Sequence, residues 1–270
     1  MPLGSVRAHV RAPWRLSGPL GGLLEGRRRR PSRVADMAEG PPPPVSAEPI
    51  VLRLPFDGPW MAQNSPARRL PSHGVDLFGE TYAIDFVAVD DRGRSASRRD
   101  WRTWLATEPP DRFVGFGKPL LAPVDGVVVA VHDGEVDHEA RRSQLALVPY
   151  ALSQRARLKA GIGAIAGNHL VLSLGQHRGF VAMVHLKARS LRVAVGEAVT
   201  EGQHVADCGN SGNSTEPHVH LQVMDNADLA VARGLPMAFR DFREWPGGRG
   251  ASVVHATGMP GERAVVEPVA

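Results

Sequence analysis

From residue 50 onward, the pattern of apolar and polar positions is mostly typical of β-strands. Residues 50–56 alternate between the two kinds of side chain, and residues 82–89 are rich in aromatic and β-branched side chains. Both patterns favour strands, in which successive side chains point to opposite faces. Further strands are expected at 170–174, 180–186, 205–208 and 219–224, and at 127–131, whose apolar run is typical of a buried strand.

Glycine and proline punctuate these segments. Pro123–Gly126 is a turn signal before residues 127–131, and Gly175–Gly179 is a short loop that would join its neighbouring strands into a hairpin. The 29 glycines and 23 prolines favour many short strands over a helical bundle. We therefore expect a mainly β fold built from packed antiparallel sheets in a sandwich-like arrangement.

Two stretches interrupt the strand pattern. Residues 90–112 are charged and carry Trp101 and Trp104. Residues 133–166 include a segment, 150–159, whose apolar spacing admits a helix. Both stretches are predicted to be loop or helix insertions between core strands.

Charge is concentrated at the start of the chain. The whole chain of 270 residues has a net charge of +4, but residues 1–36 hold eight arginines against two acids, a net +6. Residues 37–270 therefore sum to −2, which gives no electrostatic reason to expect nucleic-acid binding. With 43% hydrophobic residues, the chain has room for one large domain or two small ones.

The N-terminal segment lacks the features of an export signal. Its short apolar stretch, residues 18–24, is followed and not preceded by Arg27–Arg30, and no apolar region follows those arginines. We expect residues 1–48 to be a disordered Arg/Pro-rich segment and Met37 to be the true start. No apolar run reaches the ~20 residues of a membrane span. Cys208, the only cysteine, excludes an intramolecular disulfide and is expected to be a buried thiol.

The most informative motif is the pair His218 and His220, which follows the Gly/Ser/Asn-rich turn at residues 209–214. In a strand this spacing places both imidazoles on one face. The motif resembles the His-x-His signature of the lysostaphin class of zinc metallopeptidases, the M23 peptidoglycan endopeptidases. Residues 167–172, 184–186, 195–199 and 201–203 resemble the rest of that family's core in the same order, so the resemblance covers roughly residues 50–225.

The resemblance implies a zinc-dependent endopeptidase that hydrolyses peptide bonds in the stem or crossbridge of peptidoglycan, on the β core of the duplicated hybrid motif type. A catalytic zinc needs about three protein ligands and an open position. His220 matches one family ligand, and His73 and Asp85 are the best candidates for the other two. Asp85 lies in an apolar strand, where a carboxylate is costly to bury without a strong partner such as a cation.

A second carboxylate competes for the ligand role. Many family members place the His and Asp four residues apart, whereas His73 and Asp85 are twelve apart, and Asp76 follows His73 by three. We favour Asp85, because a strand fixes the direction of a ligand better than a glycine-containing loop does.

Two further histidines match the family's non-ligand positions. His185 and His218 would hydrogen-bond the water, stabilise the oxyanion and pass a proton to the leaving amine, since histidine changes charge near neutral pH. The remaining histidines are expected to be structural: His9, His132, His138, His169, His177, His204 and His255. Glu216 departs from the family, which usually has glycine there, and Met183 stands where an aromatic residue is frequent.

The predicted organisation is a peptidase domain over residues 49–230, with insertions at about 90–112 and 133–166, and a C-terminal extension over 231–270. The insertions would either border the substrate groove, as they do in the family, or form solvated loops.

Two rival functions are a non-enzymatic binding module of the same fold and a phosphocarrier-type or lipoyl-type β domain. The sequence alone favours the cytoplasm, whereas the family function implies the cell envelope or secretion.

Overall fold

Short β-strands dominate the computed structural model, which describes residues 48–143, 145, 147, 159, 161–175 and 179–269. The mainly β prediction is confirmed. The predicted disordered segment over 1–48, apart from Glu48, and the predicted helix over 150–159, apart from Lys159, lie outside these residues. In chain order the elements are β1 (Ile50–Arg53), β2 (Trp60–Gln63), the 3₁₀ helix η1 (Glu80–Tyr82), β3 (Ile84–Ala88), α1 (Trp101–Leu105), the 3₁₀ helix η2 (Pro110–Arg112), β4 (Pro119–Leu121), β5 (Gly126–His132), α4 (Ile162–Ala166), β6 (Asn168–Ser173), β7 (Phe180–Leu186), β8 (Ala198–Val199), β9 (His204–Asp207), β10 (Val219–Met224), β11 (Met237–Trp245), β12 (Val253–Gly258) and β13 (Val265–Pro268).

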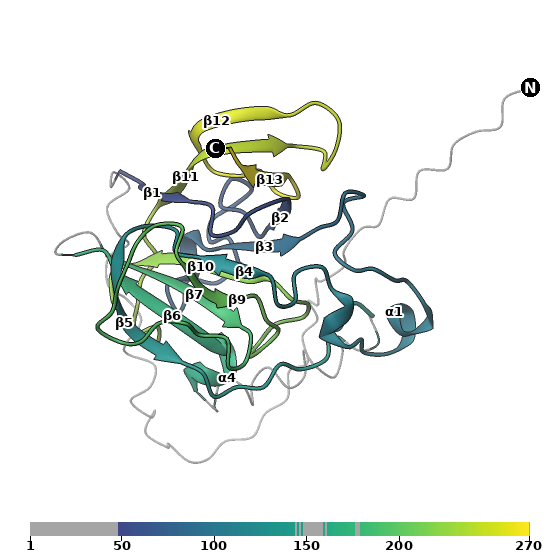
Figure 1. The fold of residues 1–270 in the computed structure, drawn as a ribbon, viewed down its shortest axis with the longest axis horizontal. Coiled ribbons are helices and arrows are strands. Elements are labelled where there is room, and N and C mark those ends of the chain that lie inside the picture. Colours follow the sequence, from purple (N-terminus) through teal and green to yellow (C-terminus); the bar gives the residue numbers. More distant parts are fainter. Residues whose placement is uncertain are drawn as a thin grey trace, which may run out of the picture. The chain divides into compact units, whose positions relative to one another are not determined.

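Most of the strands belong to one large sheet (Figure 1). Its order is β1-β11-β13-β2-β3-β10-β7-β6-β5-β8, with β12 also paired to β11, while β4 and β9 form a separate pair. Among the described strands, β1 and β11 pair in parallel and the other pairs are antiparallel. Strands β3, β10 and β7 therefore lie side by side in the middle of the sheet.

The predicted strands agree with this sheet most closely at β7 and β10. Residues 82–89 instead divide into η1 and the shorter strand β3. The expectation of a buried strand at 127–131 is wrong, because Val127 and Val131 of β5 are 42% and 36% exposed. Strand β5 lies beside the two-residue strand β8 at the end of the sheet, and only Val128 of its residues is fully covered.

A large apolar core fixes the central strands. All five residues of β3 are buried, and Phe86 packs edge-on against both Phe56 and Phe239. Phe56 in turn stacks on Trp60 with ring centroids 4.5 Å apart. Aromatic side chains of this size contribute a large share of the apolar area that a core buries. The acid on β3 is therefore presented from one of the most firmly packed strands of the protein.

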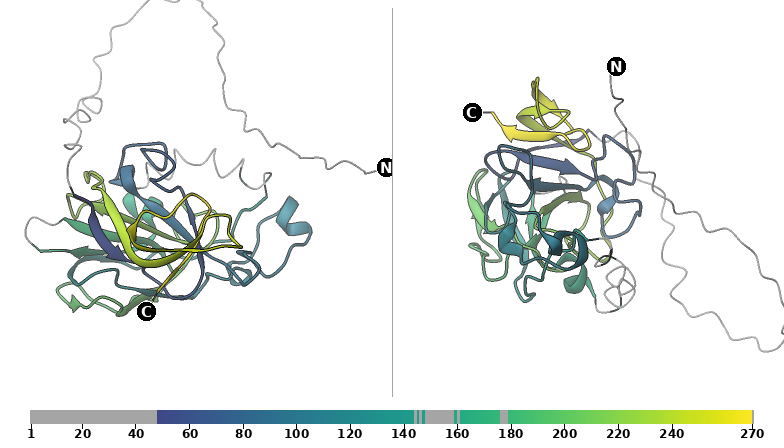
Figure 2. Two further views of the ribbon diagram at one scale, coloured as in Figure 1. Left: turned by 90° about the horizontal axis from the view of Figure 1, so that it is seen from above. Right: turned by 90° about the vertical axis from the view of Figure 1, so that its right-hand side faces the viewer.

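Residues 231–269 contribute strands to the same sheet. Strand β11 pairs with β1, and β13 pairs with β2, so segments from the two ends of the described chain lie side by side. Figure 2 shows the C-terminal strands in yellow next to the purple and blue strands β1 and β2. These strands thereby support β2, the neighbour of β3.

The two predicted insertions are tied to each other. Glu108 is fully buried and forms an ion pair with Arg142 at 2.7 Å, while its backbone pairs with that of Ala140. Helix α1 lies in the first insertion and leaves Trp101 and Trp104 exposed. None of the helices in the described part of the chain is long and apolar enough to span a membrane.

Candidate active site

Two side chains meet across the central strands β3 and β10. The sheet register places Asp85 directly opposite His220, and His220 Nδ1 lies 2.9 Å from Asp85 Oδ1. Both residues are buried, with 7% and 4% of their surfaces exposed. The strand pairing thus brings together two groups that are 135 residues apart in the chain.

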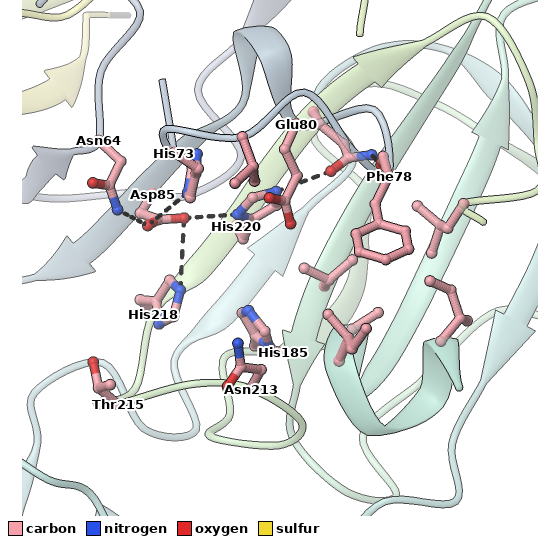
Figure 3. Close-up of a pocket in the computed structure, with 17 residues that line it drawn as sticks. Asn64, His73, Phe78, Glu80, Asp85, His185, Asn213, Thr215, His218 and His220 are labelled. Carbon is pink, nitrogen blue, oxygen red and sulfur yellow. Dashed lines mark hydrogen bonds and ion pairs between the residues drawn. The ribbon is translucent and has the colours of Figure 1, made fainter. Parts of the chain in front are cut away.

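His73 joins this pair from the loop that precedes η1. Its Nε2 lies 3.1 Å from Asp85 Oδ2, and its ring centroid is 4.7 Å from that of His220. One ligand atom from each of His73, Asp85 and His220 falls within 4.8 Å of the others. Figure 3 shows the three side chains converging on one point of a cleft.

Hydrogen bonds behind the histidines select which nitrogen faces Asp85. Ser72 Oγ donates to the carbonyl of Glu80 and therefore accepts from His73 Nδ1, at 3.0 Å in each case. Gln222 Nε2 donates to the carbonyl of Phe78, which leaves Oε1 to accept from His220 Nε2 at 2.9 Å. Protons held on these outer nitrogens leave lone pairs on His73 Nε2 and His220 Nδ1.

Two histidine lone pairs and a carboxylate therefore point toward one another. Acceptor groups repel unless a cation or a proton lies between them. In the absence of a metal, a proton on His220 takes this place. Burial lowers the pKa of His220, but the hydrogen bond to Asp85 and its charge outweigh burial and raise the pKa to about 9. A set of two imidazoles and one carboxylate is also the donor set of catalytic zinc sites, so these residues fit zinc.

The acid of this set stays ionised. Burial alone would raise the pKa of Asp85, but the neighbouring imidazoles of His73, His218 and His220, the last through a hydrogen bond, hold it well below its usual value. Asn64 Nδ2 also donates to Asp85 Oδ2 at 2.7 Å. An ionised carboxylate is the form that binds a metal.

The competing carboxylate lies elsewhere. Asp76 is exposed and accepts a hydrogen bond from Thr81. It is absent from the group of ligand atoms that contains His73, Asp85 and His220. The structure therefore brings together the long-spaced pair and leaves the short-spaced one apart.

His185 enters the cleft through an irregularity in β7. Strand β6 pairs Asn168 with Leu186 and then His169 with Val184, so that His185 is an extra, bulged residue with φ +64°. Bulges re-aim side chains and are frequent next to active sites. His185 Nδ1 donates to the carbonyl of Ser211 at 2.9 Å, which turns Nε2 toward the cleft. Burial and the nearby His218 and His220 hold the pKa of His185 well below its usual value, so it is neutral at pH 7.

His218 lies directly before β10 and faces His185, with ring centroids 4.8 Å apart. Its Nδ1 donates to the carbonyl of Glu216 at 2.8 Å, and its Nε2 lies 3.6 Å from Asp85 Oδ1. Like His185, it is held by a backbone carbonyl at Nδ1 and presents Nε2 to the centre of the cleft (Figure 3). The five candidate residues all line this one cleft, which encloses about 340 Å³.

Sequence reasoning missed three supporting residues, Asn64, Ser72 and Gln222. Gln222 carried a signal, because it follows His220 by two in a strand and thus shares its face. Asn64 and Ser72 carried none, since they reach the site through strand pairing and loop folding. Of the histidines expected to be structural, His169 is buried and donates to the carbonyl of Gly167, whereas His9 and His177 lie outside the described residues.

Comparison with known proteins identifies a family. Residues 111–231 match the model of peptidase family M23, a range that contains His185, His218 and His220 but begins after His73 and Asp85. No curated protein sequence matches the chain.

Among solved structures, the chain is similar to the catalytic domain of the antimicrobial peptidase lysostaphin from Staphylococcus simulans. The sequence identity is 18%, the match covers 59% of this chain and 80% of that one, and the TM-score is 0.33. A mutant catalytic domain of a prophage-encoded M23 protein from Enterococcus faecalis matches at 17% identity, over 71% and 91% of the two chains, with a TM-score of 0.34. A zinc-containing peptidase from Vibrio cholerae matches at 20% identity, over 57% of this chain and 45% of that one, with a TM-score of 0.29. The chain carries a domain of peptidase family M23.

Proposed function

We propose that this protein is a zinc-dependent endopeptidase that hydrolyses peptide bonds in the stem or crossbridge peptides of peptidoglycan. The observation that carries the proposal is the convergence of the lone pairs of His73 and His220 on the carboxylate of Asp85, beside two histidines whose Nε2 atoms face the same cleft. The match of residues 111–231 to peptidase family M23 supports hydrolysis of peptide bonds as the reaction. The similarity to the catalytic domain of lysostaphin motivates peptidoglycan peptides as the substrate.

His73, Asp85 and His220 would hold the metal. Zinc bound there supplies a Lewis acid that polarises a peptide carbonyl and activates water. Ser72 and Gln222 keep the two ligand histidines in the tautomers that binding requires. Asn64 orients the carboxylate of Asp85 through a hydrogen bond of 2.7 Å.

His185 and His218 would handle the protons of hydrolysis. Neutral His185 offers the lone pair of Nε2 as a base for a water molecule in the cleft. His218, fixed through Nδ1, can carry a proton on Nε2 and donate it to the carbonyl oxygen or to the leaving amine. Each ring donates from Nδ1 to a backbone carbonyl, and His218 Nδ1 also lies 3.0 Å from Ser214 Oγ, so hydrogen bonds fix both orientations.

The test combines metal analysis with an assay of hydrolysis. We expect about one zinc per chain in the wild type, cleavage of peptidoglycan fragments or oligoglycine, and loss of zinc in His220→Ala. His185→Ala and His218→Ala should retain zinc but lose activity by about 10²–10⁴-fold, the range for removal of a general acid or base. A wild-type protein that holds zinc, cleaves no peptide and binds wall fragments as well as the two mutants do would be a binding module and not an enzyme.

A further inference from the structure

The cleft has two chemically distinct halves. Beside the histidine and aspartate side chains lies an apolar half, which Figure 3 shows as a group of unlabelled carbon side chains around Phe78. We define it by the following six residues: Phe78, Ile162, Ile165, Ala166, Val184 and Leu229. They come from the loop after His73, from α4, from β7 and from the segment after β10. Four separate parts of the chain thus converge to give the cleft an apolar wall.

The apolar half has a firm floor. Ala166, Val184 and Leu229 are at most 7% exposed and belong to a second hydrophobic cluster, separate from the main core. Ile162 packs against this cluster but, like Ile165, is only partly covered. The cluster therefore opens toward the cleft through α4, where a further apolar group can complete its packing.

The wall is held at a fixed position relative to the catalytic histidines. Asn213 donates its backbone N–H to the carbonyl of Ile165 at 2.8 Å, and Ser211 in the same loop accepts from His185. Gly167 and Gly212 allow this contact, because a Cβ on Gly212 would lie 2.4 Å from the backbone nitrogen of Gly167. A group that occupies the apolar half is therefore placed at a set distance from His185.

The charges of the cleft restrict what can occupy this half. No lysine or arginine lines the cleft among the described residues, and none of the six residues of the apolar half carries a charge, so this half offers no cation to an acidic side chain. Glu80 also lines the cleft, and its negative charge disfavours a second carboxylate. A neutral apolar side chain fits both conditions.

We propose that the apolar half is a subsite for a bulky aliphatic side chain next to the scissile bond, so that this enzyme prefers such bonds over those in runs of glycine. The inference rests on the proposed peptidase function and names its substrate class. An oligoglycine chain has no side chain to pack against Ile162 and Ile165 of the apolar half, whereas a leucine side chain can contact both. Discrimination by a methylene group in an apolar pocket is about 10- to 200-fold, which sets the scale of the preference.

The test uses the full chain loaded with zinc and a series of quenched fluorescent peptides. One central glycine of an oligoglycine is replaced by leucine, lysine or aspartate, and mass spectrometry locates the cleaved bond. We expect cleavage next to leucine with kcat/KM about 10- to 200-fold above that for oligoglycine, and the slowest cleavage for aspartate. Equal or faster cleavage of oligoglycine, or a preference for lysine, overturns the subsite but leaves the proposed function intact.

Two variants test whether the preference for leucine over glycine depends on the apolar half. Ile165→Ala should move the ratio of leucine to glycine kcat/KM toward one, whereas Val253→Ala, a truncation of an exposed aliphatic residue on β12, should leave the ratio unchanged. Thermal unfolding checks that both variants fold. An unchanged ratio in Ile165→Ala contradicts the assignment of the subsite.

A binding measurement separates this inference from the proposed catalysis. The His218→Ala variant is titrated with labelled leucine-containing and oligoglycine peptides, and fluorescence anisotropy gives the Kd values. Tighter binding of the leucine peptide supports the subsite even if no peptide is cleaved. Equal Kd values for the two peptides overturn it.

Discussion

Ser95 donates a hydrogen bond from its Oγ to Oε2 of Glu216 at 3.0 Å. The first insertion, residues 90–112, is thereby joined to the segment that ends at His218. Because the backbone carbonyl of Glu216 holds His218 Nδ1, the side chain of Glu216 anchors the residue that orients a candidate catalytic histidine. A glycine at this position, as the family usually has, would lack the anchor.

We expect Ser95→Ala and Glu216→Gly to lower kcat by about two- to tenfold, the worth of one hydrogen bond of about 0.5–1.5 kcal/mol. Zinc content should be unchanged, because neither residue belongs to the group of candidate ligand atoms. Glu216→Gln should restore most of kcat, since its amide oxygen can still accept from Ser95. Ser97→Ala, which removes a hydroxyl bonded within the same insertion, is the control, and an equal loss of kcat there would contradict the anchoring role.

Gln222 controls the tautomer of His220, so its removal should weaken metal binding without removing a ligand. We expect Gln222→Ala to raise the Kd for zinc by about 10- to 100-fold. This is the usual effect of removing a residue that forms a hydrogen bond with a metal ligand. Competition with a chromophoric chelator measures the Kd. The matched control is Gln203→Ala, a half-buried glutamine whose side chain accepts a hydrogen bond from the backbone N–H of Thr200 in its own turn. A Kd for Gln222→Ala equal to that of the wild type would show that the hydrogen bond of 2.9 Å does not support binding.

The two candidate carboxylates should differ sharply in a direct comparison. Asp85→Asn removes the charge that both candidate ligand histidines, His73 and His220, face, so we expect loss of stoichiometric zinc. Asp76→Asn alters an exposed side chain outside the group of ligand atoms and should retain zinc. Metal analysis of the two purified variants decides between them, and the reverse result would make His73 and Asp76 the ligand pair.

The zinc-free protein should lose stability as the pH rises above neutrality. Its His220 has a pKa of about 9, raised above the ordinary value of 6.5 by Asp85 despite burial. The stability from this pair is fully present below about pH 6.5 and is lost as the pH rises through about 9. Ionised Asp85 contributes to the free energy of unfolding above pH 3.8. This contribution is lost as the pH falls through the lowered pKa of Asp85.

Urea unfolding of the zinc-free protein between pH 6 and 9.5 measures this effect. The free energy of unfolding should fall more steeply with pH in the wild type than in His220→Gln, which has no group that titrates at this position. Parallel curves for the two proteins would place the titrating group elsewhere.

Regular strands made part of the site predictable from sequence. His218 directly precedes β10 and His220 lies two residues further along, so the spacing of two predicted that both face one side, and a lone acid in the apolar strand β3 marks Asp85. Asn64 could not be predicted, because its contact with Asp85 depends on the register between β2 and β3. Sequence periodicity specifies faces, whereas register comes from the folded sheet.

Backbone irregularities explain other parts of the fold that were missed. Strand β11 was expected only as part of a C-terminal extension. Its Phe239 and Phe242 are three residues apart, so they break the alternation that predicts a strand. Asp241, with φ +50°, supplies the shift that lets both phenylalanines reach the core.

The bulge in β7 has a consequence for how specificity can be altered. In a regular strand, neighbours point to opposite faces, yet Val184 and His185 both line the cleft. Val184 of the apolar half and the candidate catalytic residue His185 are thus adjacent in sequence and share one distorted stretch of backbone. Mutant libraries aimed at new substrates should therefore vary Ile162 and Ile165 on α4 and keep Val184, since repacking at that position moves the histidine beside it.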